Sequence, residues 1–170
     1  QIHVPCTPHP RFEGVTAKGP RGDALAEMDA MVGAVMDSLQ AWGLDSNTLI
    51  LFSSDNGPVL DDGYQDQAAE LVGTHKPAGP YRGGKYSLFE AGTRVPFIAH
   101  WKGVVPKGQS EALISQVDLM ASLGEIIGKP AHPRDSEPLG DVLLGRSQKG
   151  RENLILEAMG RRAYRRGNWA

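Results

Sequence analysis

A short polar tripeptide, Asp55-Asn56-Gly57, offers the clearest metal chemistry in this sequence of 170 residues. A carboxylate beside an amide carbonyl supplies hard oxygen ligands of the kind that Ca²⁺ and Mg²⁺ prefer, and Gly57 lets the backbone turn sharply away. The same tripeptide is favourable turn chemistry at the end of any strand. We therefore predict Asp55 and Asn56 as metal ligands, with an ordinary strand-ending turn as the alternative.

A second segment, Tyr81-Arg82-Gly83-Gly84-Lys85, has the composition of an anion-binding loop. Adjacent glycines allow the backbone to approach an anion closely, with the Arg82 guanidinium within reach. Lys85 is a compact point charge, which suits an oxyanion or the oxygen of a leaving group. Taken alone, the segment also fits a flexible, solvated loop.

Two histidines lie in surroundings that fit the same chemistry. His3 precedes Val4-Pro5, in a stretch biased toward an extended backbone, and it is a candidate proton donor to a leaving group. His75 and Lys76 bring two basic groups into the long glycine- and proline-rich loop, where they can help to hold an anionic substrate. For all three residues, a solvated surface position is the alternative.

The elements that must position these residues read as alternating strands and helices. Residues 48–52 form a continuous, partly β-branched apolar run, which predicts a strand buried on both faces, as in a parallel sheet covered by helices. Asp55 and Asn56 follow this strand, and ligands of open α/β sheets bind beyond the carboxyl ends of the strands.

A long helix over residues 23–42 is expected to pack against that strand, with Asp23 as its N-cap. Its apolar residues recur at steps of three and four: Leu25, Met28, Val32, Val35, Met36, Leu39 and Trp42. The other expected elements are a strand over residues 95–101, helices over 115–127 and 139–144, and a C-terminal β-hairpin with strands at 153–159 and 163–169.

The amino-acid composition is that of an ordinary globular domain and argues against several other classes of protein. Hydrophobic residues make up 40% of the chain and charged residues 22%, as in an ordinary globular domain. A formal net charge of −2 gives no general footprint for nucleic acid, and no apolar run approaches the roughly 20 residues of a membrane span. The single cysteine, Cys6, excludes an internal disulfide. Because the sequence starts without methionine or a secretory signal, we expect a piece of a longer protein.

In combination, these segments resemble the type I, formylglycine-dependent sulfatases of the alkaline phosphatase-like superfamily. The resemblance covers nearly the whole chain in the family's order, and no single motif decides it. It is carried by Ile2-His3-Val4-Pro5, Asp29, Val32-Gly33, residues 47–57, Arg82-Gly83-Gly84-Lys85, Glu90-Ala91-Gly92-Thr93-Arg94-Val95-Pro96-Phe97, Trp101-Lys102-Gly103, residues 115–120 and residues 163–169.

The resemblance implies a fold and a set of roles. The fold would be part of an alkaline-phosphatase-like α/β sandwich, with a mostly parallel sheet flanked by helices, a partial catalytic domain over residues 1–150, and a β-hairpin over 151–170. Asp55 and Asn56 match two ligands of a divalent cation, usually Ca²⁺. Lys85 matches the lysine that binds the sulfate and the ester oxygen, and His3 the histidine beside the leaving group.

The resemblance also implies what lies elsewhere. The family's nucleophile, a formylglycine made from Cys or Ser in a Cys/Ser-x-Pro-x-Arg motif, and its first metal-binding aspartates would precede Gln1. Cys6 is a lookalike that we reject, because Pro10 occupies the place of the motif's arginine. The chain by itself is therefore expected to be inactive and to bind Ca²⁺ weakly. The family's usual compartment is periplasmic or secreted.

The expected substrate is a sulfate monoester of an aryl group or a carbohydrate. His75, Lys76 and Arg82 are the predicted substrate-binding residues, and the loop over residues 58–80 would set specificity, with Asp61, Asp62 and Tyr64 also available. Two alternatives stay open: a phosphomonoesterase, phosphodiesterase or phosphonate hydrolase of the same superfamily, or a non-catalytic module that binds sulfated glycans. Oligomeric state is not predicted.

Overall fold

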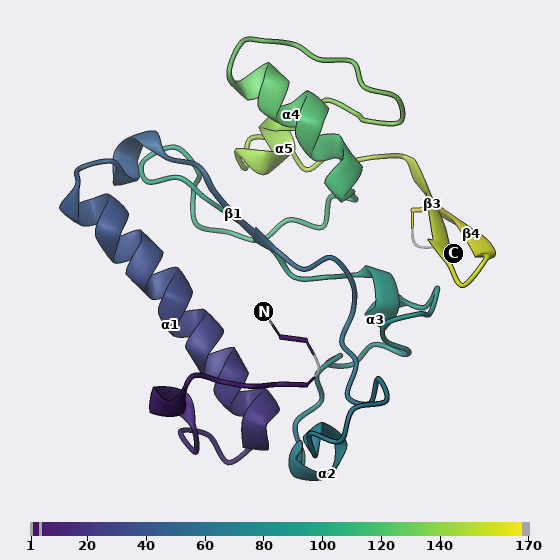
Figure 1. The fold of residues 1–170 in the computed structure, drawn as a ribbon. Coiled ribbons are helices and arrows are strands. Elements are labelled where there is room, and N and C mark those ends of the chain that lie inside the picture. Colours follow the sequence, from purple (N-terminus) through teal and green to yellow (C-terminus); the bar gives the residue numbers. More distant parts are fainter. Residues whose placement is uncertain (1, 4, 168–170) are drawn as a thin grey trace. The chain divides into compact units, whose positions relative to one another are not determined.

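A computed structural model describes residues 2–3 and 5–167, with both helices and strands (Figure 1). The chain divides into two units, which are treated separately below. Unit 1 comprises residues 1–45 and 54–95, and unit 2 comprises residues 46–53 and 96–170. The predicted division separates a catalytic domain over residues 1–150 from a hairpin over residues 151–170. It concerns domains of the family and not these two units, and it stays a prediction.

Helix α1 (Gly19–Ala41) is the main element of unit 1 (Figure 1). It begins before Asp23, with Pro20 in its first turn, where the missing N–H costs nothing. Asp23 is 4% exposed, and its carboxylate accepts hydrogen bonds from the N–H groups of Gly14 at 2.8 Å and Thr16 at 2.9 Å. The prediction of Asp23 as the N-cap is therefore wrong. Asp23 lies within α1, and its side chain bonds the loop that precedes the helix.

The apolar stripe that the sequence predicts on α1 is only partly covered. Val35 is 55% exposed and Trp42, which follows the last residue of the helix, is 72% exposed. The first turns are covered best, since Ala24 packs with Cys6 and Ile2 in a small apolar cluster. The N-terminal segment therefore lies against the beginning of α1.

The remaining helices of unit 1 are short. They are a 3-10 turn at Pro10–Phe12, α2 (Ala68–Leu71) and α3 (Glu90–Thr93), and most of the chain between residues 54 and 95 is loop. A further 3-10 turn, Asp45–Asn47, crosses the boundary between the units. Long irregular loops in a folded domain commonly carry function, as the sequence predicts for this one.

Unit 2 contains the strand that precedes the predicted metal ligands. Strand β1 (Ile50–Ser53) pairs antiparallel with β2 (Phe97–His100), with Ile50 opposite His100 and Ser53 opposite Phe97. Both predicted strands are thus observed, but β1 is half-buried along its length rather than buried on both faces. The pair does not confirm a mostly parallel sheet, because its two members run in opposite directions.

Unit 2 also contains a helical pair that lies side by side in the ribbon (Figure 1). A 3-10 turn at Gln116–Asp118 leads into α4 (Leu119–Ile126), and α5 is Gly140–Leu143. These elements match the predicted helices over residues 115–127 and 139–144 within a few residues. Their buried apolar residues are Ala121, Val142, Leu143 and Leu144.

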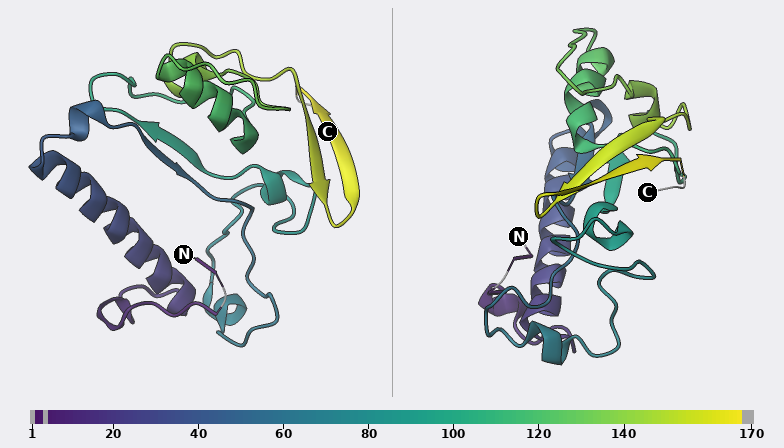
Figure 2. Two further views of the ribbon diagram at one scale, coloured as in Figure 1. Left: turned by 45° about the horizontal axis from the view of Figure 1, so that its top comes forward. Right: turned by 90° about the vertical axis from the view of Figure 1, so that its right-hand side faces the viewer.

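A β-hairpin ends the described chain (Figure 2). Strand β3 (Asn153–Ala158) pairs antiparallel with β4 (Arg161–Arg166), with Ala158 opposite Arg161. The two loop residues, Met159 and Gly160, have φ values of 50° and 70°, as a two-residue turn of type I′ requires. The predicted hairpin around Gly160 is confirmed, although β4 begins earlier than expected, and Asn168 and Trp169 lie outside the described residues.

Candidate active site

Backbone hydrogen bonds fix the predicted metal-ligand turn to the predicted anion loop within unit 1. The N–H of Gly57 donates to the carbonyl of Gly92 at 3.0 Å, and the N–H of Lys85 donates to the carbonyl of Pro58 at 2.9 Å. A third bond connects the anion loop with the segment that contains Gly92, because the carbonyl of Arg82 accepts the N–H of Ala91 at 3.0 Å. Three segments between residues 55 and 92 therefore share one backbone framework.

Close contact between these backbones explains two of the glycines. A Cβ placed on Gly57 would lie 1.7 Å from the carbonyl oxygen of Ala91, and one on Gly84 would lie 2.7 Å from that of Pro58. Both contacts are with backbone atoms, so no side chain can move aside to make room. The sequence suggested that the glycines allow an anion to approach, but at Gly84 the group that approaches is another part of the chain.

Substitution of Gly57 by alanine is expected to break this framework. The added methyl group must displace the backbone of residues 91 and 92, and overpacking of this kind costs about 1–3 kcal/mol or more. We expect a lower midpoint of thermal unfolding. The matched control is Gly33→Ala in the middle of α1, where a Cβ meets nothing within 4 Å, so that the variant should be as stable as the wild type or up to about 1 kcal/mol more stable. Equal stability of Gly57→Ala and Gly33→Ala would contradict the packing argument.

Asp55 and Asn56 are held by the turn in a state that suits a hard cation. The side chain of Asp55 is exposed, and Asn56 is half-buried. The Asn56 amide nitrogen donates to the carbonyl of Gly57 at 2.9 Å, which leaves the amide oxygen as the atom for a ligand. Among the residues that the structure describes, no group of three or more His, Cys, Asp or Glu side chains is placed to hold a metal ion. The pair fits part of a calcium site and would need oxygen ligands from elsewhere.

Lys85 is engaged by a carboxylate from the loop over residues 58–66. Its ammonium lies 3.2 Å from a carboxylate oxygen of Asp62, and the two side chains are 15% and 19% exposed. The Tyr86 hydroxyl donates to the same carboxylate at 2.9 Å. Asp62, which the sequence placed among residues available to substrate, is therefore turned toward Lys85 instead.

The charges of this cluster stabilise one another. Interaction with the Tyr86 hydroxyl, followed by the hydrogen bond from Lys85, holds the pKa of Asp62 below its usual value. Interaction with Tyr86 and then with Asp62 raises the pKa of Lys85. The ammonium and the carboxylate are therefore both ionised across the neutral range, as ion-pair electrostatics requires.

His3 interacts electrostatically with the same carboxylate. Its charge contributes, together with Tyr86 and Lys85, to the lowered pKa of Asp62. The N-terminal segment is anchored close by, because the N–H of Cys6 donates to the carboxylate of Asp66 at 2.9 Å. The loop over residues 58–66 thus carries both the anchor of the His3 segment and the partner of Lys85.

The predicted substrate-binding residues are placed differently. His75 and Lys76 are exposed on successive turns, where the N–H of His75 donates to the carbonyl of Val72 at 3.2 Å. Arg82 is exposed, and its guanidinium lies 3.9 Å from the centre of the Phe89 ring. Within the described chain, none of these three side chains contacts the Lys85–Asp62 pair, and their role in binding stays a prediction.

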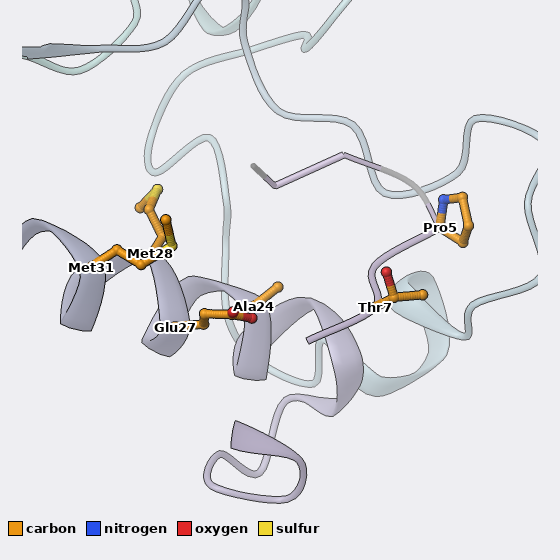
Figure 3. A pocket seen from close by; sticks show the side chains of 6 residues that line it. All are labelled: Pro5, Thr7, Ala24, Glu27, Met28 and Met31. Carbon is orange, nitrogen blue, oxygen red and sulfur yellow. The ribbon is translucent and has the colours of Figure 1, made fainter. Parts of the chain in front are cut away.

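Cys6 has the surroundings of a structural thiol. It is 6% exposed, and burial, followed by the charge of Asp66, raises the pKa of its thiol. Nucleophilic cysteines need the opposite shift, which supports the rejection of Cys6 as the nucleophile. Beside this segment, a hollow against α1 contains none of the predicted catalytic or metal-binding residues (Figure 3); its lining is Pro5, Thr7, Ala24, Glu27, Met28 and Met31.

Comparison with known proteins identifies the family to which the chain belongs. The model of the family described as Sulfatase matches residues 5–129, which include the predicted metal-ligand turn, the predicted anion loop and Asp62. The chain belongs to the sulfatase family. The predicted resemblance to sulfatases of the alkaline phosphatase-like superfamily is confirmed.

Curated relatives agree with this assignment. An N-acetylgalactosamine-6-O-sulfatase of Bacteroides thetaiotaomicron is 44% identical over 173 residues, covering 99% of this chain and 34% of the relative. Human arylsulfatase A is 32% identical over 156 residues, covering 88% of this chain and 29% of that protein. The sulfatase chain therefore spans about a third of the length of such relatives.

Solved structures share the fold. A Bacteroides thetaiotaomicron structure from work on glycosaminoglycan metabolism superposes with a TM-score of 0.92 at 44% identity, covering 98% of this chain and 35% of that one. A sulfatase from Pseudoalteromonas sp. superposes with a TM-score of 0.76 at 28% identity, covering 92% and 31%. In the described part of this chain, no helix has both the length and the apolarity to cross a membrane.

Proposed function

We propose that this chain works as part of a longer polypeptide that hydrolyses sulfate monoesters. The observation that carries the proposal is the shared framework of unit 1, in which the Asp55-Asn56-Gly57 turn is bonded to Gly92 and Lys85 to Pro58. In a member of the sulfatase family, this framework supports a site in which the oxygen-ligand pair and the Lys85 ammonium would act on the same sulfate group.

The roles proposed for the two catalytic residues follow from charge. As the S–O bond breaks, negative charge moves to the leaving oxygen, and a cation fixed in advance stabilises that charge. Lys85 is the proposed cation for the sulfate and the ester oxygen, since its pKa is raised and its ammonium persists. His3 is the proposed donor of a proton to the leaving group, because it lies within electrostatic reach of the same cluster.

Two further components are proposed from the family resemblance. Asp55 and Asn56 would hold a divalent cation, Ca²⁺, together with oxygen ligands from outside these 170 residues. The cation supplies Lewis-acid polarisation of the sulfate oxygens. The proposed nucleophile is a formylglycine from a Cys/Ser-x-Pro-x-Arg motif upstream of Gln1. Absence of that motif from the parent gene would refute the formylglycine assignment.

A carbohydrate sulfate is the substrate class to test first. The relative that is 44% identical is an N-acetylgalactosamine-6-O-sulfatase, so we propose a 6-O-sulfated amino sugar, with a small aryl sulfate as the convenient chromogenic substitute. His75, Lys76 and Arg82 remain the proposed substrate-binding side chains, from an exposed surface of unit 1.

The geometry favours hydrolysis over a non-catalytic glycan-binding module. The exposed His75, Lys76 and Arg82 fit either function, but the Lys85 ammonium is largely buried and held by Asp62, as a cation that acts on a bound ester requires. A phosphate-ester substrate shares the cation framework, and the full-length protein should be assayed with matched aryl sulfate and aryl phosphate to separate the two.

Removal of divalent cations is the direct test of the metal. We expect the full-length protein to hydrolyse an aryl sulfate, to lose most of that activity in EDTA, and to regain it with Ca²⁺. The isolated 170-residue chain should show no turnover, because Asp55 and Asn56 alone are too few ligands for tight binding. Turnover by the isolated chain, or full activity of the parent in EDTA, would contradict this part of the proposal.

A further inference from the structure

The cluster around Lys85 contains more than the proposed sulfate-binding cation. The Asp62 carboxylate accepts hydrogen bonds from the Lys85 ammonium at 3.2 Å and from the Tyr86 hydroxyl at 2.9 and 3.2 Å. We infer that Asp62 is a positioning residue, which aims the Lys85 ammonium at the reacting ester and is itself held by Tyr86. The inference rests on the proposed sulfatase function.

A lysine side chain needs such a partner in order to act as a fixed cation. Its four-carbon stem has about 2 kcal/mol of rotamer entropy, and its ammonium carries three donors. One donor bound to Asp62 fixes the direction of the other two, which are then available to sulfate and leaving-group oxygens. The backbone of Lys85 is already fixed by its bond to Pro58, so Asp62 holds the end of the side chain that the backbone leaves free.

The position of Tyr86 supports the same reading. Tyr86 has a φ of 72°, in the left-handed region that large side chains avoid. Such strain costs about 1–3 kcal/mol and persists where the surrounding structure determines it. Here the unusual backbone brings the Tyr86 hydroxyl onto the carboxylate that the neighbouring Lys85 binds.

The hydrogen-bond donors to Asp62 lie outside the predicted metal site. The Lys85 ammonium and the Tyr86 hydroxyl donate to its carboxylate, and the charge of His3 contributes last to its lowered pKa. Neither Asp55 nor Asn56 is among them, so the inference does not depend on the metal site.

The experiment compares Asp62→Asn with wild type in the full-length protein, using aryl sulfates whose leaving groups differ in pKa. Asparagine keeps the shape of the side chain and removes its charge. We expect kcat/KM to fall about 10-fold for a nitrophenyl sulfate and about 100-fold for a poorer leaving group, because a misdirected cation fails most where the leaving oxygen carries most charge. Asp62→Glu should recover part of the loss, and Tyr86→Phe should show the same trend with a smaller effect.

Three comparisons decide between outcomes. In a Lys85→Ala background, Asp62→Asn should have little further effect, since residues that act as one unit are not additive. Asp37→Asn, the same change at an exposed position of α1, should leave the kinetics unchanged. A loss that is equal for all leaving groups, or that persists in the Lys85→Ala background, overturns the positioning role of Asp62. A wild-type protein without sulfate-ester turnover overturns the proposed function itself.

Discussion

Replacement of Lys85 by alanine is expected to lower kcat/KM for sulfate-ester hydrolysis by about 10²–10³-fold, the usual loss when one preorganised donor to a developing oxyanion is removed. The structure supplies the reason for a large effect. The ammonium is partly buried, with 15% of its side chain exposed, and it is held by Asp62 before substrate arrives. It therefore needs little reorganisation in the transition state.

Arginine at this position should not restore activity. Its guanidinium is a planar fork with a longer reach, whereas the space beside Asp62 and Tyr86 holds a point charge. The measurement is steady-state kinetics of the full-length variants with an aryl sulfate. Lys107→Ala, which removes an exposed lysine of unit 2, is the matched control and should leave kcat/KM unchanged. A Lys85→Ala protein within a few-fold of wild type would refute the proposed role.

The candidate site residues could be nominated from the sequence, but the contacts that hold them could not. Asp55, Asn56 and Lys85 were found from residue type and motif order. The pairing of Lys85 with Asp62 joins residues 23 positions apart, and it depends on loop bonds such as that between Lys85 and Pro58, which have no periodicity to reveal them. Tyr86 gave no signal at all, because a tyrosine at positive φ contradicts local propensity.

The fold shows the same division between local and non-local information. Strong local patterns predicted α1 and the hairpin around Gly160, whose two-residue turn follows from short-range chemistry. Asp23 misled the prediction of the start of α1, because an aspartate before an apolar stripe looks like a cap, and only the loop contacts at Gly14 and Thr16 show otherwise. Strand direction at β1 is likewise a tertiary property, which one apolar run does not encode.

Stability of unit 2 should depend strongly on a buried ion pair that the sequence did not reveal. The Arg151 guanidinium lies 2.7 Å from a carboxylate oxygen of Asp118, and the two side chains are 9% and 3% exposed. Asp118 also accepts the N–H groups of Ser115 and Glu137, both at 2.9 Å. It therefore connects the start of α4 with the loop that leads to α5 and with the segment before β3.

Removal of one partner leaves the other charge buried without compensation. We expect Arg151→Met to lower the free energy of unfolding by about 3–5 kcal/mol, measured by chemical denaturation. The matched control is Arg146→Met. The pair that Arg146 forms with Asp141 spans 3.8 Å, with side chains 58% and 69% exposed, so its loss should cost at most about 1 kcal/mol. Similar losses in both variants would contradict the importance of the buried pair.

The pH dependence of stability gives a second reading of the same pair. Burial raises the pKa of Asp118, but the hydrogen bonds from Arg151, Glu137 and Ser115 outweigh it, so that the pKa in the folded protein lies below its ordinary value. A carboxyl whose pKa is lower in the folded than in the unfolded state binds its proton more readily after unfolding. Its stabilisation is therefore complete above the unfolded pKa of about 4 and is lost as the pH falls toward the folded value. Arg151→Met should reduce this loss of stability in acid, because the pKa of Asp118 rises without the guanidinium. If the free energy of unfolding of the variant falls with decreasing pH as steeply as that of the wild type, other carboxylates cause the loss.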